Sequence, residues 1–342
     1  MKRINLALQG GGAHGAFTWG VLDTLLQDEE IEIAGITGTS AGAMNGAALK
    51  AGMLKGGRDG ARANLDWFWE KMGAAQVPGL DLWFAAVPPG MVSRSMEYSW
   101  PFMAADMMQQ MTSPYAMGPL YAHPLRAIVD EMSFDLICAD QGPALFVCAT
   151  NVRSGKARVF SGSEISTDAL LASACLPTMF QAVDVYDPKS GQTEAYWDGG
   201  YTGNPSLWPL FDRKFPDDVV IVNINPLRRE TLPVTPQQIA NRINEISFNA
   251  SLMSELRAVA FVQRLIAQGA LKQEEKRDVK VHMIADDALM NSLSVMTKSW
   301  PVTSVLLQLK EAGQAAAKAF LSAHKDDLNA QGTVDLAAMY GG

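Results

Sequence analysis

The chain has 342 residues, of which 48% are hydrophobic and 19% are charged, and its net charge is −8. This balance is typical of a globular protein rather than a disordered one, and the length allows one large domain or two ordinary ones. The acidic charge, without a basic stripe to pair with phosphates, argues against a nucleic-acid partner.

The cysteines and the hydropathy pattern indicate the cellular compartment of the protein. The three cysteines, an odd number, lie in apolar surroundings, which favours a reducing compartment over a disulfide framework: Cys138, Cys148 and Cys175. The apolar stretch after Lys2 and Arg3 is too short for a signal peptide, and no run approaches the ~18 apolar residues of a membrane span. We expect a cytoplasmic protein, with peripheral membrane contact left open.

The first 49 residues read as strand, glycine-rich loop, helix, strand, sharp turn and helix. Residues 3–9 form the first expected strand, residues 16–26 have helical spacing of apolar side chains, and residues 32–37 form the second strand. A βαβ opening predicts a mostly parallel central sheet flanked by helices.

The second strand runs into Gly38-Thr39-Ser40-Ala41-Gly42, a G-x-S-x-G pentapeptide that we call the serine turn. Between a strand and a helix, this motif holds a serine in a strained conformation with its hydroxyl presented to a substrate. The helix start adds free backbone N–H groups and a positive dipole end. On this pattern alone, a nucleophile and an ordinary glycine-rich turn remain comparable interpretations of Ser40.

The segment Gly10-Gly11-Gly12-Ala13-His14-Gly15, which we call the glycine loop, admits two interpretations. Its G-x-G-x-x-G pattern is that of a dinucleotide-binding module, but such a module needs an acidic residue ending the second strand. Here that strand ends in the serine turn instead. The alternative is a row of backbone N–H groups able to surround an oxyanion.

Residues 66–121 are rich in tryptophan and methionine, and Pro88-Pro89-Gly90 interrupts them. This composition suits an inserted cap over a substrate channel, a membrane-facing patch, or an irregular insertion packed on the main sheet. The side chains concerned are Trp67, Trp69, Trp83, Phe84, Trp100, Phe102, Met91, Met96, Met103, Met107, Met108, Met111 and Met117.

Regular structure is expected again from residue 124 onward. The sequence predicts helices over residues 124–132, 167–174, 236–275 and 302–323, and strands over residues 144–150, 157–160, 182–186, 193–197, 219–225 and 279–285. We therefore expect one α/β catalytic domain over residues 1–225, with the cap at about 66–121. Residues 226–342 would form a mostly helical C-terminal layer packed on the same domain.

A serine nucleophile needs a group to take its proton, and the histidines are poor candidates. They lie in the glycine loop, before a proline, inside a strand and after the last helix: His14, His123, His282 and His324. The order Ser40, Asp198, His282 would fit a Ser–Asp–His esterase, although such folds usually place more strands before the serine. Asp198 ends a strand and precedes Gly199 and Gly200, a pattern that fits both an ordinary Asp-Gly turn and a carboxylate that projects from the turn towards another backbone. A water-poor site beside Trp197 would raise its pKa enough for it to act as a base.

Together, the glycine loop, the serine turn and Asp198-Gly199-Gly200 resemble the patatin-like phospholipases, which are lipid acyl hydrolases. The order of the three motifs matches, and residues 124–126 and 172–177 also look like family segments. The resemblance covers residues 4 to about 225. One departure is His14, which stands where relatives often have arginine or lysine.

The resemblance implies a Ser40–Asp198 dyad that works without histidine. We also expect no metal or cofactor, because the sequence has neither zinc-type ligand spacing nor an acidic cage for calcium. By the same resemblance, backbone N–H groups of the glycine loop would hold the oxyanion, at Gly10, Gly11, Gly12 and Ala13. The remaining motif positions are Gly15, Gly38, Gly42, Gly199 and Gly200. The expected substrate is a lipid or another long-chain ester; the sequence gives neither the particular ester nor the oligomeric state.

Overall fold

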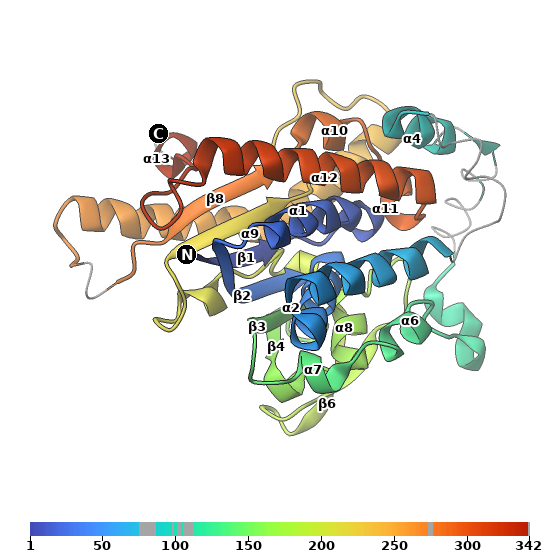
Figure 1. The fold of residues 1–342 in the computed structure, drawn as a ribbon. Coiled ribbons are helices and arrows are strands. Elements are labelled where there is room, and N and C mark those ends of the chain that lie inside the picture. The colour runs from blue at the N-terminus through green and yellow to red at the C-terminus, as the bar shows by residue number, and fades with distance from the viewer. Residues whose placement is uncertain (75–86, 98, 101–103, 105–111, 273–275, 341–342) are drawn as a thin grey trace.

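The computed structural model describes residues 1–74, 87–97, 99–100, 104, 112–272 and 276–340. Within them, eight strands form one sheet in the order β5-β6-β3-β2-β1-β7-β8, with β4 also paired to β3 (Figure 1). The strands are β1 (Lys2–Leu8), β2 (Ile31–Thr39), β3 (Ala144–Asn151), β4 (Ala157–Ser161), β5 (Val183–Asp187), β6 (Gln192–Asp198), β7 (Asp218–Asn223) and β8 (Lys280–Ala285).

The sheet is mixed, with a parallel centre. Strands β3, β2, β1, β7 and β8 run parallel to their neighbours, whereas β4, β5 and β6 are antiparallel additions at the β3 end. The β5–β6 hairpin turns at Gly191, which has a φ of 71°. The predicted α/β fold with a mostly parallel sheet flanked by helices is confirmed.

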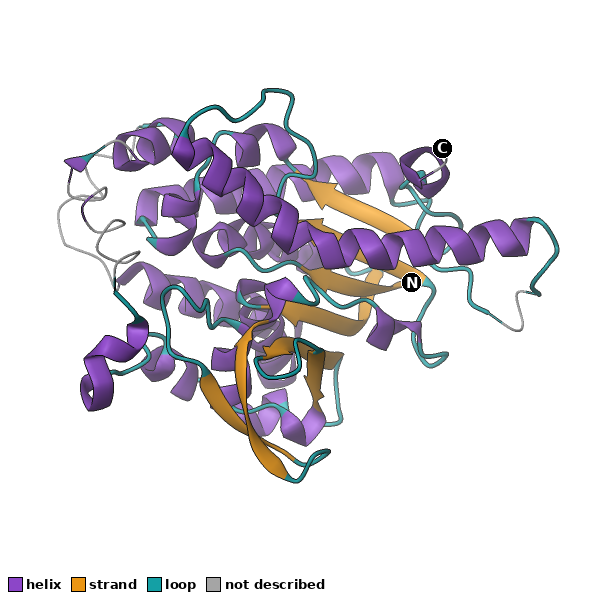
Figure 2. Cartoon of the chain, turned by 180° about the vertical axis from the view of Figure 1, so that it is seen from behind, coloured by secondary structure: helices purple, strands orange, loops and turns teal. Residues whose placement is uncertain are grey.

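Helices cover both faces of this sheet because alternate side chains of the buried strands are apolar on each face. On one face, Ile4, Leu6 and Leu8 of β1 share a core with helices α1, α2 and α12. On the other, Ala7 packs in a second core with residues of β7, β8 and α9. Figure 2 shows the helices on both sides of the sheet. The helices include α1 (Ala16–Gln27), α2 (Ala41–Ala74), α4 (Pro89–Glu97), α6 (Arg126–Asp130), α7 (Phe134–Ile137), α8 (Thr167–Ser173), α9 (Pro236–Ala267), α10 (Asp287–Asn291), α11 (Val295–Ser299), α12 (Thr303–His324) and α13 (Leu336–Tyr340).

Helix α2 is longer than the sequence suggested, because it bends and returns. The bend lies at Gly56 and Gly57, where the backbone leaves the helical conformation. Beyond it the second half runs back along the first, with Asn64 Nδ2 donating to the Ala48 carbonyl at 2.7 Å. Trp67 and Trp69 therefore belong to α2 rather than to an irregular insertion.

The rest of the tryptophan- and methionine-rich region is described only in part. Helix α4 begins at Pro89, a residue that fits the first turn of a helix. Trp100 and Met91 are exposed, by 80% and 55%, whereas Met96 is buried. Trp83, Phe84, Phe102, Met103, Met107, Met108 and Met111 lie outside the described residues, as does the side chain of Met117.

The C-terminal region contributes to the sheet as well as to the helical layers. Strand β8 extends the parallel centre beside β7, and α12 packs along α1 (Figure 1). Among the residues described, no helix combines the length and apolar character needed to cross a membrane.

Candidate active site

Ser40 lies between the last residue of β2 and the first of α2. Its φ is 54°, in the left-handed region that a residue with a Cβ adopts only under constraint. The constraint is visible in its hydrogen bonds: Ser40 N–H donates to Ser173 Oγ at 2.8 Å, and Ser173 Oγ donates to the Cys148 carbonyl at 2.6 Å. Ser173, the last residue of α8, thus fixes the serine turn against β3.

Asp198 is brought beside Ser40 by the pairing of three strands. Thr39 of β2 pairs with Cys148 of β3, and the next β3 residue, Ala149, pairs with Asp198 of β6. Ser40 and Asp198 therefore flank β3 at the same level of the sheet. Thr39 Oγ1 also donates to the carbonyl of Gly203, at 2.5 Å, which holds the segment after Asp198 to the serine turn.

The Asp198 carboxylate is buried and only partly satisfied. Its side chain belongs to a residue that is 1% exposed, and Oδ1 accepts the Gly200 N–H at 2.7 Å. Oδ2 has no hydrogen-bond partner in the described part of the chain. Burial raises the pKa of Asp198 to about 7, against the opposing pull of the Gly200 N–H and the nearby Ser40 hydroxyl.

The glycine loop passes over the serine turn. A Cβ on Gly10 would lie 2.7 Å from Ser40 Cβ, so this approach requires glycine. Gly10 N–H donates to Asn204 Oδ1 at 2.6 Å and is therefore not free to bind a substrate oxygen. Gly12, with a φ of 56°, and Ala13 open a 3₁₀ turn, so their N–H groups precede its first internal hydrogen bond.

The remaining motif glycines mark close contacts between these elements. A Cβ at any of these positions would lie less than 3 Å from an atom of a neighbouring residue. The pairs of glycine and neighbour are Gly15 and Ala41, Gly38 and Gly42, Gly42 and Leu8, Gly199 and Cys148, and Gly200 and Phe248. The three motifs thus form one packed unit at the carboxyl ends of β1 and β2.

The histidines do not join Ser40 and Asp198. In the sheet register, His282 is level with Val220, Leu6 and Ile36, four residues before Ser40. Its Nε2 lies 3.0 Å from Asp218 Oδ1 and its Nδ1 3.2 Å from Thr333 Oγ1. The other three bond elsewhere within the described residues: His14 to Thr297, His123 to the Leu125 N–H and His324 to Asp327.

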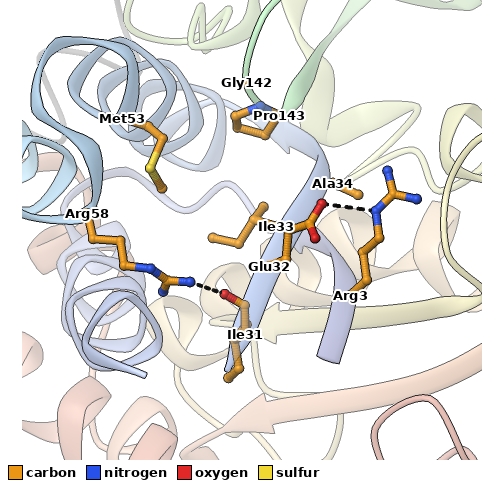
Figure 3. Close-up of a pocket in the computed structure, with 9 residues that line it drawn as sticks. All are labelled: Arg3, Ile31, Glu32, Ile33, Ala34, Met53, Arg58, Gly142 and Pro143. Carbon is orange, nitrogen blue, oxygen red and sulfur yellow. Dashed lines mark hydrogen bonds and ion pairs between the residues drawn. The ribbon is translucent and has the colours of Figure 1, made fainter. Parts of the chain in front are cut away.

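A cavity of about 410 Å³ lies away from this unit, at the amino ends of β1 and β2 (Figure 3). Its charged side chains are already engaged: Arg3 pairs with Glu32 at 3.1 Å, and Arg58 donates to several backbone carbonyls, including that of Ile31. Since parallel α/β folds bind ligands at the carboxyl ends of their strands, we do not assign a site here.

A second cavity, of about 320 Å³, lies nearer the serine turn and has mostly apolar walls. It is lined by Trp19, Trp69, Glu70, Gly73, Thr303, Leu306 and Leu307 of α1, α2 and α12. Because α2 doubles back, Trp69 reaches the start of the same helix, where its Nε1 donates to Asn45 Oδ1 at 3.0 Å. The Trp69 ring is 3.3 Å from where a Cβ on Gly15 would stand.

Several residues that hold this unit together carry little or no signal in the sequence. Ser173 lies in a segment already noted as family-like, which could have indicated it. Asn204, Asn225 and Lys298 carry no local signal, because each reaches the glycine loop from more than 180 residues away.

A constrained serine beside a buried carboxylate, at the carboxyl ends of parallel strands, is typical of hydrolytic enzymes. The family model described as patatin-like phospholipase matches residues 6–211, so the chain belongs to the patatin-like phospholipase family. This membership supports lipid acyl hydrolase activity in general, with lipids as the substrate class. The dinucleotide-binding alternative is therefore set aside.

Comparison with solved structures gave, among others, the crystal structure of VipD from Legionella pneumophila. It has a TM-score of 0.44 and 14% sequence identity, and the alignment covers 95% of this chain and 67% of that one. No curated protein gave a significant match.

Proposed function

We propose that the chain is a serine lipid acyl hydrolase, of the phospholipase A, lysophospholipase or carboxylesterase type, with Ser40 as nucleophile and Asp198 as base. The observation that carries the proposal is the Asp198 carboxylate, buried beside the hydroxyl of a serine in a constrained conformation and with Oδ2 held by no other group among the described residues. A carboxylate whose pKa is raised to about 7 is a useful base at neutral pH.

In the proposed reaction, Ser40 Oγ forms a bond to the ester carbonyl carbon while its proton passes to Asp198. The tetrahedral intermediate then collapses, the bond to the alcohol oxygen breaks, and the alcohol leaves with the proton from Asp198. Water attacks the acyl-serine and gives a proton to Asp198. The acyl–oxygen bond breaks, and Ser40 recovers that proton.

Backbone N–H groups of Gly11, Gly12 and Ala13 are the proposed donors to the oxyanion. Two of them open the 3₁₀ turn and have no acceptor within it. We leave Gly10 out, because its N–H is bonded to Asn204. Loss of one such donor typically costs about 3–4 kcal/mol of transition-state stabilisation.

We further propose that the cavity beside Trp69 receives the acyl chain. Its walls are mostly apolar, and Gly15 separates it from Ala41, the residue after the nucleophile. A medium or long acyl chain would gain burial there that a short one would not.

Transient contact with a membrane surface is a separate proposal, supported by the exposure of Trp100 and Met91. Co-sedimentation with neutral and with anionic vesicles tests it, with Trp100→Ser as the comparison. Absence of the wild-type protein from both pellets would remove it.

The decisive experiment is intact-mass spectrometry after incubation with a fluorophosphonate, with Ser40→Ala as the control. The proposed function predicts one adduct on the wild type and none on the variant, followed by hydrolysis of a panel of lipid esters. A folded wild-type protein that forms no adduct, either in buffer or with detergent micelles, would contradict it.

A further inference from the structure

Lys298 is a half-buried cation that the proposed Ser40–Asp198 reaction does not use. Its Nζ donates to Asn225 Oδ1 at 2.8 Å and to Asn244 Oδ1 at 3.3 Å, two neutral acceptors. The nearby carboxylate, Glu245, is already paired with Arg229 and Arg242. Burying an ammonium group without its own carboxylate costs free energy, so this position is one where a functional reason is expected.

The lysine is tied to the glycine loop by its backbone and by its side chain. Its carbonyl lies so close to Gly12 that a Cβ there would collide with it. Asn225, which holds the ammonium group, donates through Nδ2 to the Gly10 carbonyl at 2.8 Å and to Gln9 Oε1 at 3.1 Å. Asn225 Oδ1 is also 3.7 Å from where a Cβ on Gly11 would stand.

The glycine loop brings no positive charge of its own. His14 is its titratable residue, and its Nε2 lies 2.8 Å from Thr297 Oγ1, next to Lys298 in sequence. Burial, with Lys298 nearby, holds the pKa of His14 well below its usual value, so the ring is neutral at physiological pH.

We propose that Lys298 is a positioning residue for ester hydrolysis, whose ammonium group holds the glycine loop through Asn225 and adds positive potential where the oxyanion forms. This inference rests on the proposed function. A cation fixed in a water-poor site stabilises negative charge that develops in the transition state more than it stabilises the neutral substrate.

The charge state of Lys298 predicts a pH signature. Burial lowers its pKa to about 8, with Arg229 lowering it further and Glu245 opposing. Activity should therefore fall above pH 8, as the ammonium group loses its proton. The titratable and charged side chains that face this region come from the glycine loop, α4, the segment before α9, and α9: His14, Glu97, Arg229, Arg242 and Glu245.

The test compares Lys298→Met, Lys298→Arg and Lys50→Met in the full chain, with a short p-nitrophenyl ester as substrate. Lys50 is the control, a lysine that is more deeply buried than Lys298: it is 3% exposed, and its Nζ donates to the Ala139 carbonyl at 2.7 Å. We expect Lys298→Met to lower kcat about tenfold to hundredfold with KM nearly unchanged, and to lose the alkaline fall in activity. Lys298→Arg should recover part of kcat, and Lys50→Met should stay within about twofold of wild type.

Melting temperatures and fluorophosphonate labelling separate the outcomes. A Lys298→Met protein with wild-type kcat, or with its alkaline limb intact, would overturn the inference, as would equal losses in Lys50→Met. If Lys298→Met does not fold, two other results test the inference: the fall in wild-type activity above pH 8 and the partial recovery of kcat in Lys298→Arg. Absence of the alkaline fall in the wild type would overturn it. A wild-type protein without label or activity would overturn the proposed function, and this inference with it.

Discussion

The two parts of the chain on either side of Asn225 contribute to the candidate site in different ways. The N-terminal part carries every recognisable motif and both members of the proposed dyad, and the family match ends within it, at residue 211. The C-terminal part carries no motif, yet Asn249, Lys298 and Phe248 reach Gln9, the glycine loop and Gly200. Motifs thus mark the atoms proposed to react, whereas the residues that hold those atoms in place come from distant elements.

We propose that both parts form a single folding unit. The core on one face of the sheet contains Phe17 and Val21 of α1 together with Leu309 and Phe320 of α12. Calorimetry should then show one cooperative transition for the full chain. Two resolved transitions would contradict this proposal and would indicate that the two parts unfold separately.

The largest expected effect concerns the N-terminal part. Ser40→Ala and Asp198→Asn should each lower kcat/KM for a p-nitrophenyl ester by at least about 10⁴-fold, because nucleophile and base act as a unit. Glu255→Gln is the matched control: burial raises the pKa of Glu255 to about 7 too, but its carboxylate accepts the N–H groups of Leu207 and Trp208. Comparable losses in Glu255→Gln would argue against a specific role for Asp198.

The pH dependence of kcat/KM should follow from the raised pKa of Asp198, in the N-terminal part. A base must be ionised, so kcat/KM should rise through pH 7 and fall about tenfold for each pH unit below it. A rising limb with its midpoint near pH 4 would show that an unperturbed carboxylate controls the reaction.

The stability of the folded state should change with pH in the opposite sense to kcat/KM. The folded state binds the Asp198 proton more tightly than the unfolded state does, so stability falls as pH rises from about 4 to 7. Asp198→Asn removes this cost and should be more stable than wild type above pH 7, by a few kcal/mol, and equal to it below pH 4. Urea denaturation at pH 3.5 and 8 measures the difference; an equal offset at both would contradict it.

Ser173→Ala tests how the serine turn is held. Without Ser173 Oγ, the buried Ser40 N–H loses its acceptor, at about 1–3 kcal/mol of stability, and kcat should fall about tenfold to hundredfold. Ser166→Ala removes the cap of the same helix, where Ser166 Oγ accepts the Ala169 N–H at 3.2 Å. It should lower stability by about 1 kcal/mol and leave kcat unchanged. Parallel losses of activity in both would assign the effect to α8 as a whole.

Asn249→Leu tests the C-terminal contribution. Asn249 Oδ1 accepts Gln9 Nε2 at 3.1 Å, and its Nδ2 donates to the carbonyls of Asn225 and Pro226. We expect about 1–3 kcal/mol of destabilisation and a severalfold lower kcat, while the exposed Ser254→Ala on the same helix should change neither. A wild-type kcat in Asn249→Leu would show that Asn249, in the C-terminal part, does not help to position the reacting groups.

The smallest effect should appear in chain-length preference. Leu307, which is 49% exposed, lines the cavity beside Trp69, so Leu307→Trp should narrow it. Hydrolysis of a dodecanoate ester should fall severalfold relative to an acetate ester. Leu232→Trp, at a site 81% exposed and away from the cavity lining, is the control. An unchanged ratio of dodecanoate to acetate hydrolysis in Leu307→Trp would contradict the proposal that this cavity receives the acyl chain.

Much of this architecture could be predicted because its signals are local. The strand, glycine loop and serine turn each lie within a few consecutive residues, and Asp198 was found through its two glycines. The return of α2 cannot be predicted from the sequence, because paired glycines such as Gly56 and Gly57 are as typical of a helix end as of a bend. The position of Lys298 cannot be predicted either, because its partners, Asn225 and Asn244, are 73 and 54 residues away in sequence. Only tertiary contacts bring such residues together.

Strand β3 has a consequence for how this chain tolerates changes in length. Ser40 and Asp198 both take their positions from neighbouring residues of β3, Cys148 and Ala149. The distance along the chain between Ser40 and Asp198 therefore does not set their distance in space. Changes in length between α2 and β3 that spare α6 and α7, whose Val129 and Ile137 lie in the core, should therefore leave Ser40 and Asp198 in register.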